Sequence, residues 1–206
     1  APSAAERSNG WYVWLGIGVL ALVVRIVYLY QVEGLVFFQH LVGDAKGYDA
    51  WAQRIAAGEW WAGEPFYQAP LYPYFLAGVY ALLGHDLWVV RVVQCVLGAA
   101  ACSMVGVAGC SFISRRVGVV AGVMMALYPP GIYFDGILQK TSLGFFLMAC
   151  LLVALCIRAK RSRWWRWFIV GALVGLLSLT RENALVLAPL IIVWVFVSGG
   201  GLRAAS

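Results

Sequence analysis

Acidic and basic side chains that could act together recur at the edges of the long apolar stretches of this chain. A carboxylate can serve as a general base or ligate a divalent cation, and lysine or arginine can hold a phosphate. A charge at mid-membrane costs about 2.5–3.5 kcal/mol, so one that is kept usually has a partner or a function. The candidates are Arg25, Asp44, Lys46, Asp49, Arg54, Arg91, Asp135, Lys140, Arg181 and Glu182.

The composition indicates that these residues belong to a membrane protein. The 206-residue chain is 63% hydrophobic and only 12% charged, whereas a soluble domain carries about 25% charged residues. Its net charge of +6 does not indicate nucleic acid, because the basic residues lie in short segments between apolar runs. We therefore predict an all-α polytopic membrane protein with about six transmembrane helices, at 11–30, 88–113, 117–134, 137–157, 164–180 and 184–198.

A seventh apolar run, Leu71–Gly84, decides the topology. Runs of 10 to 14 residues are more often interfacial or re-entrant than spanning. If this run spanned, the basic residues after the second and fourth spans would lie outside, against the positive-inside rule. If it does not span, nine of the fifteen basic residues lie inside with only one of the nine acidic residues, Glu6. These basic residues are Arg7, Arg115, Arg116, Arg158, Lys160, Arg161, Arg163, Arg166 and Arg203.

The predicted organisation follows from that choice. We expect a cytoplasmic tail at 1–10, a first span at 11–30 that is a retained signal anchor, and a long external loop at 31–87. Five further spans fill 88–198, and a cytoplasmic tail covers 199–206.

The external loop is predicted to contain an amphipathic helix on the membrane surface. Asp44 follows Gly43 and can cap the N-terminus, apolar residues then recur at helical spacing, and Gly58 suits the position after the last turn. The loop is also rich in aromatic residues, which are typical anchors at the membrane interface. These are Trp60, Trp61, Phe66, Tyr67, Tyr72 and Tyr74.

Under this topology the other charged residues reach the same external face as Asp44. Asp135 and Lys140 flank the turn between the third and fourth spans, and Arg181 and Glu182 lie between the fifth and sixth. Carboxylates and cations that converge on one membrane face suit an anionic substrate held beside a general base or a metal.

The order of several motifs resembles one group of membrane enzymes. The chain looks like the lipid-linked-sugar glycosyltransferases with the C-type membrane fold, in particular the protein mannosyltransferase and aminoarabinose transferase group, over their N-terminal half. The resemblance rests on Gly43-Asp44 to Tyr48, Pro65 to Tyr74, Leu83-Gly84 before Arg91, Arg115-Arg116, Ala126 to Pro130 and Gly175 to Arg181.

The resemblance implies an enzyme that inverts the sugar centre as it moves a sugar from a polyprenyl-phosphate donor to an acceptor hydroxyl, outside the cytoplasm. Asp44 would orient or deprotonate the acceptor. The substrate-binding residues would be Lys46, Asp49, Arg91, Lys140 and Arg181. A divalent cation, if used, would be held by Asp44 and Asp135. The partners expected are the polyprenyl-phosphate sugar and membrane lipid, in a bacterial inner membrane, and no nucleic acid.

The chain departs from the pattern of that group in two places and in length. Ala45 stands where protein mannosyltransferases carry a second acidic residue, and Gln68-Ala69 replaces an acidic-basic pair of the aminoarabinose transferases. Members of the group usually run to more than twice this length. Two interpretations stay open: a glycosyltransferase, whole or partial, and a non-catalytic subunit of a larger membrane complex. A transporter is less favoured, because no pair of broken helices recurs in two halves.

Overall fold

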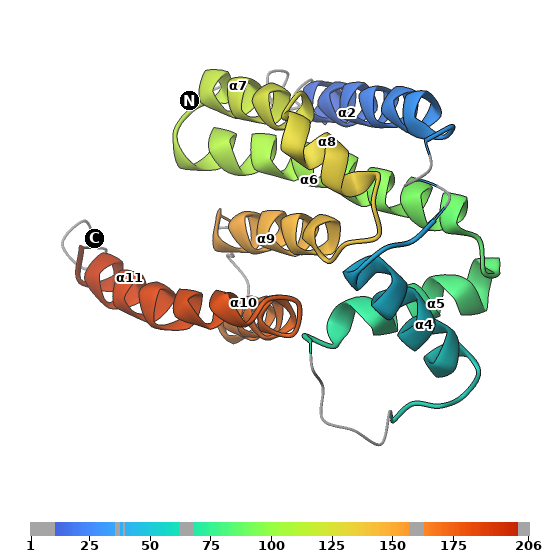
Figure 1. Cartoon of the computed structure of the whole chain (residues 1–206). Helices are drawn as coiled ribbons and strands as arrows, with labels where there is room; N and C mark the ends of the chain where they lie inside the picture. Colours follow the sequence, from blue (N-terminus) through green and yellow to red (C-terminus); the bar gives the residue numbers. More distant parts are fainter. Residues whose placement is uncertain (1–10, 36–37, 39, 62–67, 157–162, 202–206) are drawn as a thin grey trace.

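The computed structural model describes residues 11–35, 38, 40–61, 68–156 and 163–201. The predicted N-terminal tail, most of the basic cluster after the fourth span, and part of the aromatic loop segment lie outside these residues. The described part is helical throughout, without a strand (Figure 1). Its elements are α2 (Trp11–Val32), α4 (Asp44–Ala56), α5 (Leu71–Leu83), α6 (Leu87–Phe112), α7 (Arg115–Ala126), α8 (Pro129–Asp135), α9 (Thr141–Cys156), α10 (Arg163–Ser178), η1 (Glu182–Val186) and α11 (Leu187–Gly201).

Two of the described helices, α2 and α6, are long and apolar enough to cross a membrane. The bent pair of α7 and α8 could form a third span. Helices α9, α10 and α11 have 16, 16 and 15 residues, so each is about 24 Å long or less against a hydrocarbon core of about 30 Å. The predicted all-helical membrane class is confirmed at the level of two or three candidate spans, and the count of six stays a prediction.

The predicted third span is divided by two adjacent prolines. Helix α7 ends at Ala126, and Pro129 and Pro130 open α8 after a bend of 53°. Proline has no backbone N–H to continue the helical ladder, and it pushes the residue before it out of the helical region. The bend redirects the chain so that Asp135, at the end of α8, points into the bundle.

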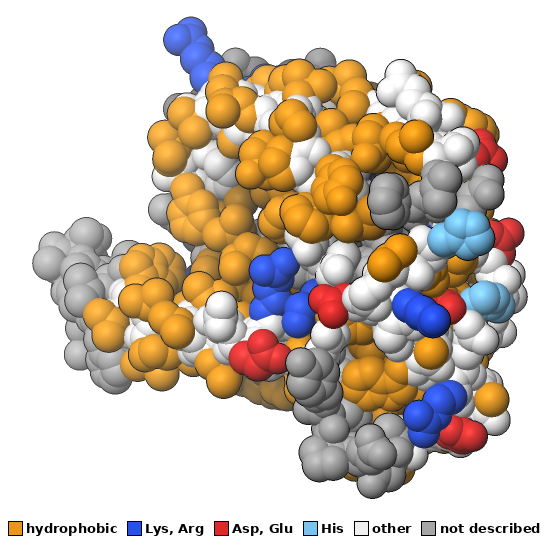
Figure 2. All heavy atoms as spheres, in the orientation of Figure 1, with side chains coloured by type: hydrophobic (Ala, Val, Ile, Leu, Met, Phe, Trp, Pro, Cys, Tyr) orange, Lys and Arg blue, Asp and Glu red, His pale blue; other side chains and the backbone are white. Residues whose placement is uncertain are grey.

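Helix α6 forms the centre of the bundle and packs against α2, α7 and α9. Small residues allow the close contacts: a Cβ atom on Gly106 would lie 2.9 Å from the ring of Trp14 and 3.3 Å from the carbonyl oxygen of Gly118. Large apolar side chains of α2, α7 and α10 remain exposed on the outer surface. Figure 2 shows hydrophobic side chains over most of the bundle, whereas charged side chains gather beside α4 and α5.

We call the end of the bundle near α4 and α5 the loop end. It comprises α4 and α5, the last turn of α2, the first two turns of α6, the α8–α9 turn (136–140) and the α10–η1 turn (179–181). Figure 1 shows α4 and α5 beside the start of α6. A backbone bond from Leu71 N to Leu179 O, 3.0 Å long, joins α5 to this end. Helix α5 has 13 residues, about 20 Å, so it is too short to span alone.

The predicted amphipathic helix is α4. Its apolar face buries Tyr48, Ala52 and Ile55, and Gly58 follows it with a positive φ of 100°. The predicted N-cap is wrong by one residue: Gly43, at φ 62°, is the N-cap, and Asp44 is the first residue of the helix. A positive φ at that position favours glycine over aspartate.

Candidate functional site

Asp44 lies exposed at the first turn of α4. Its Oδ1 atom accepts a hydrogen bond of 3.1 Å from Nε2 of Gln68, which comes from the segment just before α5. The N-terminus of a helix carries free N–H groups and favours a negative charge. The carboxylate is therefore held at a helix end and still open to a ligand.

The turn between α10 and η1 meets this part of α4. Tyr48, one turn after Asp44, has a buried hydroxyl that bonds to no residue of the described chain. Burial raises the pKa of Tyr48; the charges of Asp44 and Glu182 raise it further, and Arg181 lowers it. The charges of all three groups therefore act on one tyrosine hydroxyl, although they come from segments more than 130 residues apart in the sequence.

Arg181 is bonded to the start of α9. Its Nη2 atom donates to Oγ1 of Thr141 at 2.9 Å, and Thr141 directly follows Lys140. Lys140 is half-buried, Lys46 is exposed on α4, and the ammonium group of neither bonds to anything in the described part of the chain. The loop end thus carries two unpaired lysines and one arginine that is bound only to a hydroxyl.

An open pocket of about 320 Å³ lies beside these residues. Its walls come from the last turns of α2, the segment at 38–45, α6, and the end of α8 with the turn that follows it. They are mainly apolar, with Tyr28, Val32, Leu35, Leu41, Ile137 and Leu138 among them. Ala45 and Gln139 also line the pocket. They adjoin Asp44 and Lys140 in sequence, so the pocket borders the charged part of the loop end.

Arg91 is the charged residue of the pocket wall. It is 3% exposed, donates from Nη2 to the carbonyl oxygen of Phe38 at 2.6 Å, and lies over the Phe38 ring at 3.7 Å from its centroid. Its Nε atom is buried without a hydrogen-bond partner. Within the described residues no carboxylate forms an ion pair with it. A buried cation of this kind favours an anion in the adjoining pocket.

Asp49 has a different environment from Asp44. Its side chain accepts from the Tyr80 hydroxyl at 2.6 Å and from Gln53 Nε2 at 2.8 Å, and it contacts His85 Nε2 at 2.9 Å. Burial and the bond to Asp49 raise the pKa of Tyr80. Both carboxylate oxygens are therefore occupied, and Asp49 joins α4 to α5 and to His85 in the segment after α5.

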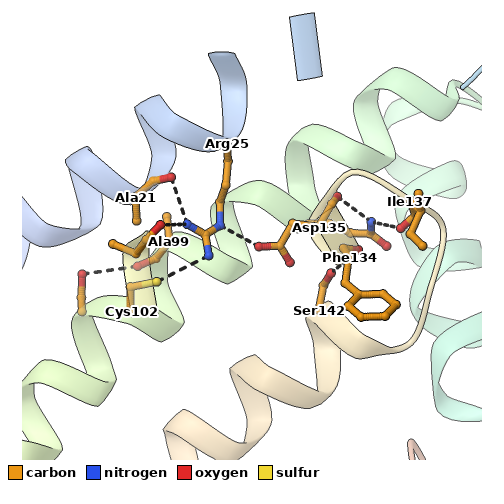
Figure 3. Close-up of polar contacts among 11 residues, drawn as sticks. Ala21, Arg25, Ala99, Cys102, Phe134, Asp135, Ile137 and Ser142 are labelled. Atoms are coloured by element: carbon orange, nitrogen blue, oxygen red, sulfur yellow. Dashed lines mark hydrogen bonds and ion pairs between the residues drawn. The ribbon is translucent and has the colours of Figure 1, made fainter. Parts of the chain in front are cut away.

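Asp135 lies inside the bundle and is paired with Arg25 (Figure 3). Arg25 Nε donates to Asp135 Oδ2 at 2.6 Å, and the two side chains are each 1% exposed. The guanidinium also donates to the carbonyl oxygens of Ala21 and Ala126 at 3.1 and 3.2 Å. The partner that a charge inside an apolar run requires is therefore, for Arg25, the carboxylate of Asp135.

The structure does not bring Asp135 to Asp44 as a pair of metal ligands. Asp135 is buried in the bundle with its Oδ2 atom bonded to Arg25, and its Oδ1 atom has no partner among the described residues, whereas Asp44 is exposed on α4. The described residues also contain no group of three or more histidine, cysteine, aspartate or glutamate side chains that could hold a metal. A divalent cation shared by Asp44 and Asp135 stays a prediction.

The loop end contains a buried polar pair that the sequence analysis does not predict. Gln94, in α6, and Tyr72, in α5, are both 0% exposed and share a hydrogen bond of 2.5 Å. Tyr72 is thus a core residue and not an interfacial anchor. A lone glutamine inside a long apolar run is the signal that could have identified this pair, because an amide within a membrane helix needs partners.

A comparison with protein families finds a match to the later part of the chain. The family model for dolichyl-phosphate-mannose-protein mannosyltransferase matches residues 67–205, about two thirds of the chain. The match contains Arg91, Asp135, Lys140 and Arg181, and begins after Asp44. No curated protein and no solved structure is significantly similar.

Proposed function

The chain belongs to the dolichyl-phosphate-mannose-protein mannosyltransferase family, and we propose that it transfers a sugar from a polyprenyl phosphate to an acceptor hydroxyl at the loop end. Membership supports the coarser statement, a membrane glycosyltransferase of the C type. The donor lipid, the acceptor and the role of each residue are our proposal. The observation that carries it is Arg91, a buried cation that pairs with no carboxylate of the described residues, in the wall of an apolar pocket.

The pocket suits a ligand with a negative head and an apolar chain. Val32, Leu35, Leu41 and Leu138 offer apolar contacts, so burial of prenyl methylenes there is favourable by about 0.8 kcal/mol per CH₂. The guanidinium group of Arg91, which lines the pocket, would bind a phosphate oxygen. A charge-assisted bond of this kind is stronger than a neutral one.

Lys140 and Arg181 are the cations that we assign to the leaving phosphate. As the bond from the sugar to the phosphate oxygen breaks, its electron pair stays on that oxygen. The positive charges of Lys140 and Arg181 would stabilise the growing negative charge, and neither residue forms an ion pair with a carboxylate of the described chain. Lys46, on the exposed face of α4, would contact charged or polar groups of the substrate.

Asp44 is the proposed general base. It would take the proton of the acceptor hydroxyl as the acceptor oxygen forms its bond to the anomeric carbon, on the face opposite the departing phosphate. The carbon centre is thereby inverted. We assign Asp49 to the contact between α4 and α5, because its oxygens are already occupied. No step is routed through a metal, since Asp135 is held by Arg25.

We further propose that the loop end faces the extracytoplasmic side of a bacterial inner membrane, with residues 1–10 and 199–206 in the cytoplasm. Most of the basic residues then lie inside, as the positive-inside rule requires.

The test is transfer of radiolabelled sugar from a mixed pool of polyprenyl-phosphate sugars in membranes that carry this chain. Asp44→Asn removes the base without changing its shape, and should lower kcat by about 10²–10⁴-fold. Glu59→Gln is the matched control, since Glu59 is an exposed carboxylate paired only with exposed Arg54. Arg91→Met should raise the KM for the donor, and Arg54→Met should leave it unchanged.

Unchanged transfer by Asp44→Asn would refute the role of Asp44. Absence of transfer from a stably inserted native chain would overturn the proposed activity and favour a subunit of a larger complex. Purification of the tagged chain would then identify its companions.

A further inference from the structure

Gln94 connects three separate segments at the loop end. Its Oε1 atom accepts the 2.5 Å bond from the Tyr72 hydroxyl, and its Nε2 atom donates to the carbonyl oxygens of Asp135 and Ile137 at 3.0 and 2.7 Å. Tyr72 belongs to α5, and the two carbonyls belong to the end of α8 and the turn after it. One buried side chain of α6 is therefore bonded to both neighbouring segments.

The chemistry of the amide explains why this position suits glutamine. Helix α8 ends at Asp135, so the carbonyl groups at its end have no partner in the next turn. An amide carries two N–H groups at fixed geometry, and both are used here. Gln94 is 0% exposed and lies within a candidate membrane span. Water is therefore poorly placed to replace the amide.

The segment held by Gln94 is one wall of the pocket. Gly136, Ile137, Leu138 and Gln139 all line it. Figure 3 shows the turn running from Asp135 past Ile137 toward the helix that carries Ser142. The other partner of Gln94, Tyr72, lies four residues after Gln68 in the sequence, and Gln68 is the residue bonded to Asp44. The same amide thus joins the pocket wall to the segment that holds the proposed base.

We propose that Gln94 is a positioning residue that sets the distance between the lipid-phosphate pocket and Asp44. This inference rests on the proposed function for its catalytic consequence, but its structural part does not. The Arg25–Asp135 ion pair attaches the end of α8 to α2. Only Gln94, among the described residues, bonds by its side chain to both α5 and the α8–α9 turn.

The experiment compares Gln94→Met, which keeps the volume and removes all three bonds, with Tyr72→Phe, which leaves the two bonds to the turn. Each is combined with Gln139→Cys, and reaction with a water-soluble maleimide is followed at that residue by mass spectrometry. We expect labelling at least fivefold faster in Gln94→Met and within twofold of the parent in Tyr72→Phe. Leu82→Cys, an exposed position on α5, serves as the control site and should not change.

Kinetics supply the second readout. Gln94→Met should raise the KM for the polyprenyl-phosphate sugar about tenfold and leave the acceptor KM within twofold. Unchanged labelling at position 139 would overturn the proposal, whatever the activity. A loss of activity that only follows the amount of folded chain, with both KM values unchanged, would overturn the positioning role. If the native chain transfers no sugar, the proposed function fails, and the labelling result still decides whether Gln94 holds the turn.

Discussion

Replacement of Arg25 by methionine should be among the most destabilising single changes in this chain. The substitution leaves the carboxylate of Asp135 buried and without its cation, and it removes the bond that Arg25 donates to Ala126 O at the end of α7. Loss of one partner from a buried pair costs about 3–5 kcal/mol. That is roughly a 10²–10⁴-fold change in the unfolding equilibrium, at about 1.4 kcal/mol per tenfold.

The two partners are not equivalent, and this asymmetry sharpens the prediction. In Asp135→Asn, the guanidinium of Arg25 keeps its bonds to the carbonyl oxygens of Ala21 and Ala126, and the new amide oxygen can still accept from it. This variant should therefore lose clearly less stability than Arg25→Met. The double variant removes both charges and should recover at least half of the loss, because a neutral amide is less costly to bury than a carboxylate.

The assay is equilibrium unfolding in detergent micelles, followed by helical circular dichroism as denaturing detergent is added. Arg54→Met is the matched control: its ion pair with Glu59 is also short, at 2.9 Å, but the side chains are 53% and 60% exposed. Such surface pairs contribute about 0–1 kcal/mol. The reasoning is refuted if Arg25→Met is no worse than Arg54→Met, or if the double variant is no more stable than Arg25→Met.

Two further changes test other contacts. Gly98→Ala should destabilise the chain strongly in the same unfolding assay, because a Cβ there would overlap the carboxylate of the buried ion pair. Gly16→Ala should be neutral or slightly stabilising, because nothing lies within 4 Å of a Cβ at that position. Tyr80→Phe should lower the free energy of unfolding by about 1 kcal/mol, since Asp49 keeps two other partners. A change near zero would show that the Tyr80–Asp49 bond does not stabilise the α4–α5 contact. The pKa of Tyr80 is raised above its ordinary value of 10.0, so the contribution of its hydroxyl to folding stability is complete below pH 10 and falls above it. The free energy of unfolding should therefore decline more steeply at alkaline pH in the native chain than in Tyr80→Phe.

The helices that the sequence predicts best are those with long apolar runs. The run at 11–30 becomes α2 at Trp11–Val32, and the run at 88–113 becomes α6 at Leu87–Phe112. Twenty or more apolar residues leave few structural alternatives. Gly58 after α4 follows from the sequence, because glycine readily adopts a positive φ. The break before Pro129 does not, because the apolar run at 117–134 predicts one continuous span although proline interrupts the helix there.

The polar contacts of the bundle were less predictable. Both Asp49 and Asp135 were assigned to substrate or metal from their position near the membrane edge. The structure gives Asp49 three partners from α4, α5 and His85, and pairs Asp135 with a residue 110 positions away. A charge near an apolar run indicates that the residue has either a partner or a function. The sequence pattern is the same in the two cases, so it does not tell one from the other.

The sequence alone thus determined the all-helical membrane class, the bounds of the longest helices, and the resemblance to the family that the comparison later matched. Only the tertiary structure decided that Arg91 lines a pocket and pairs with no carboxylate of the described residues, that Arg25 pairs with Asp135, and that Gln94 bonds to α5 and to the α8–α9 turn. The physical reason is that apolar length is a local property, encoded within one segment. The partner of a buried polar group depends on how each helix is rotated and where it crosses its neighbours, which no single segment encodes.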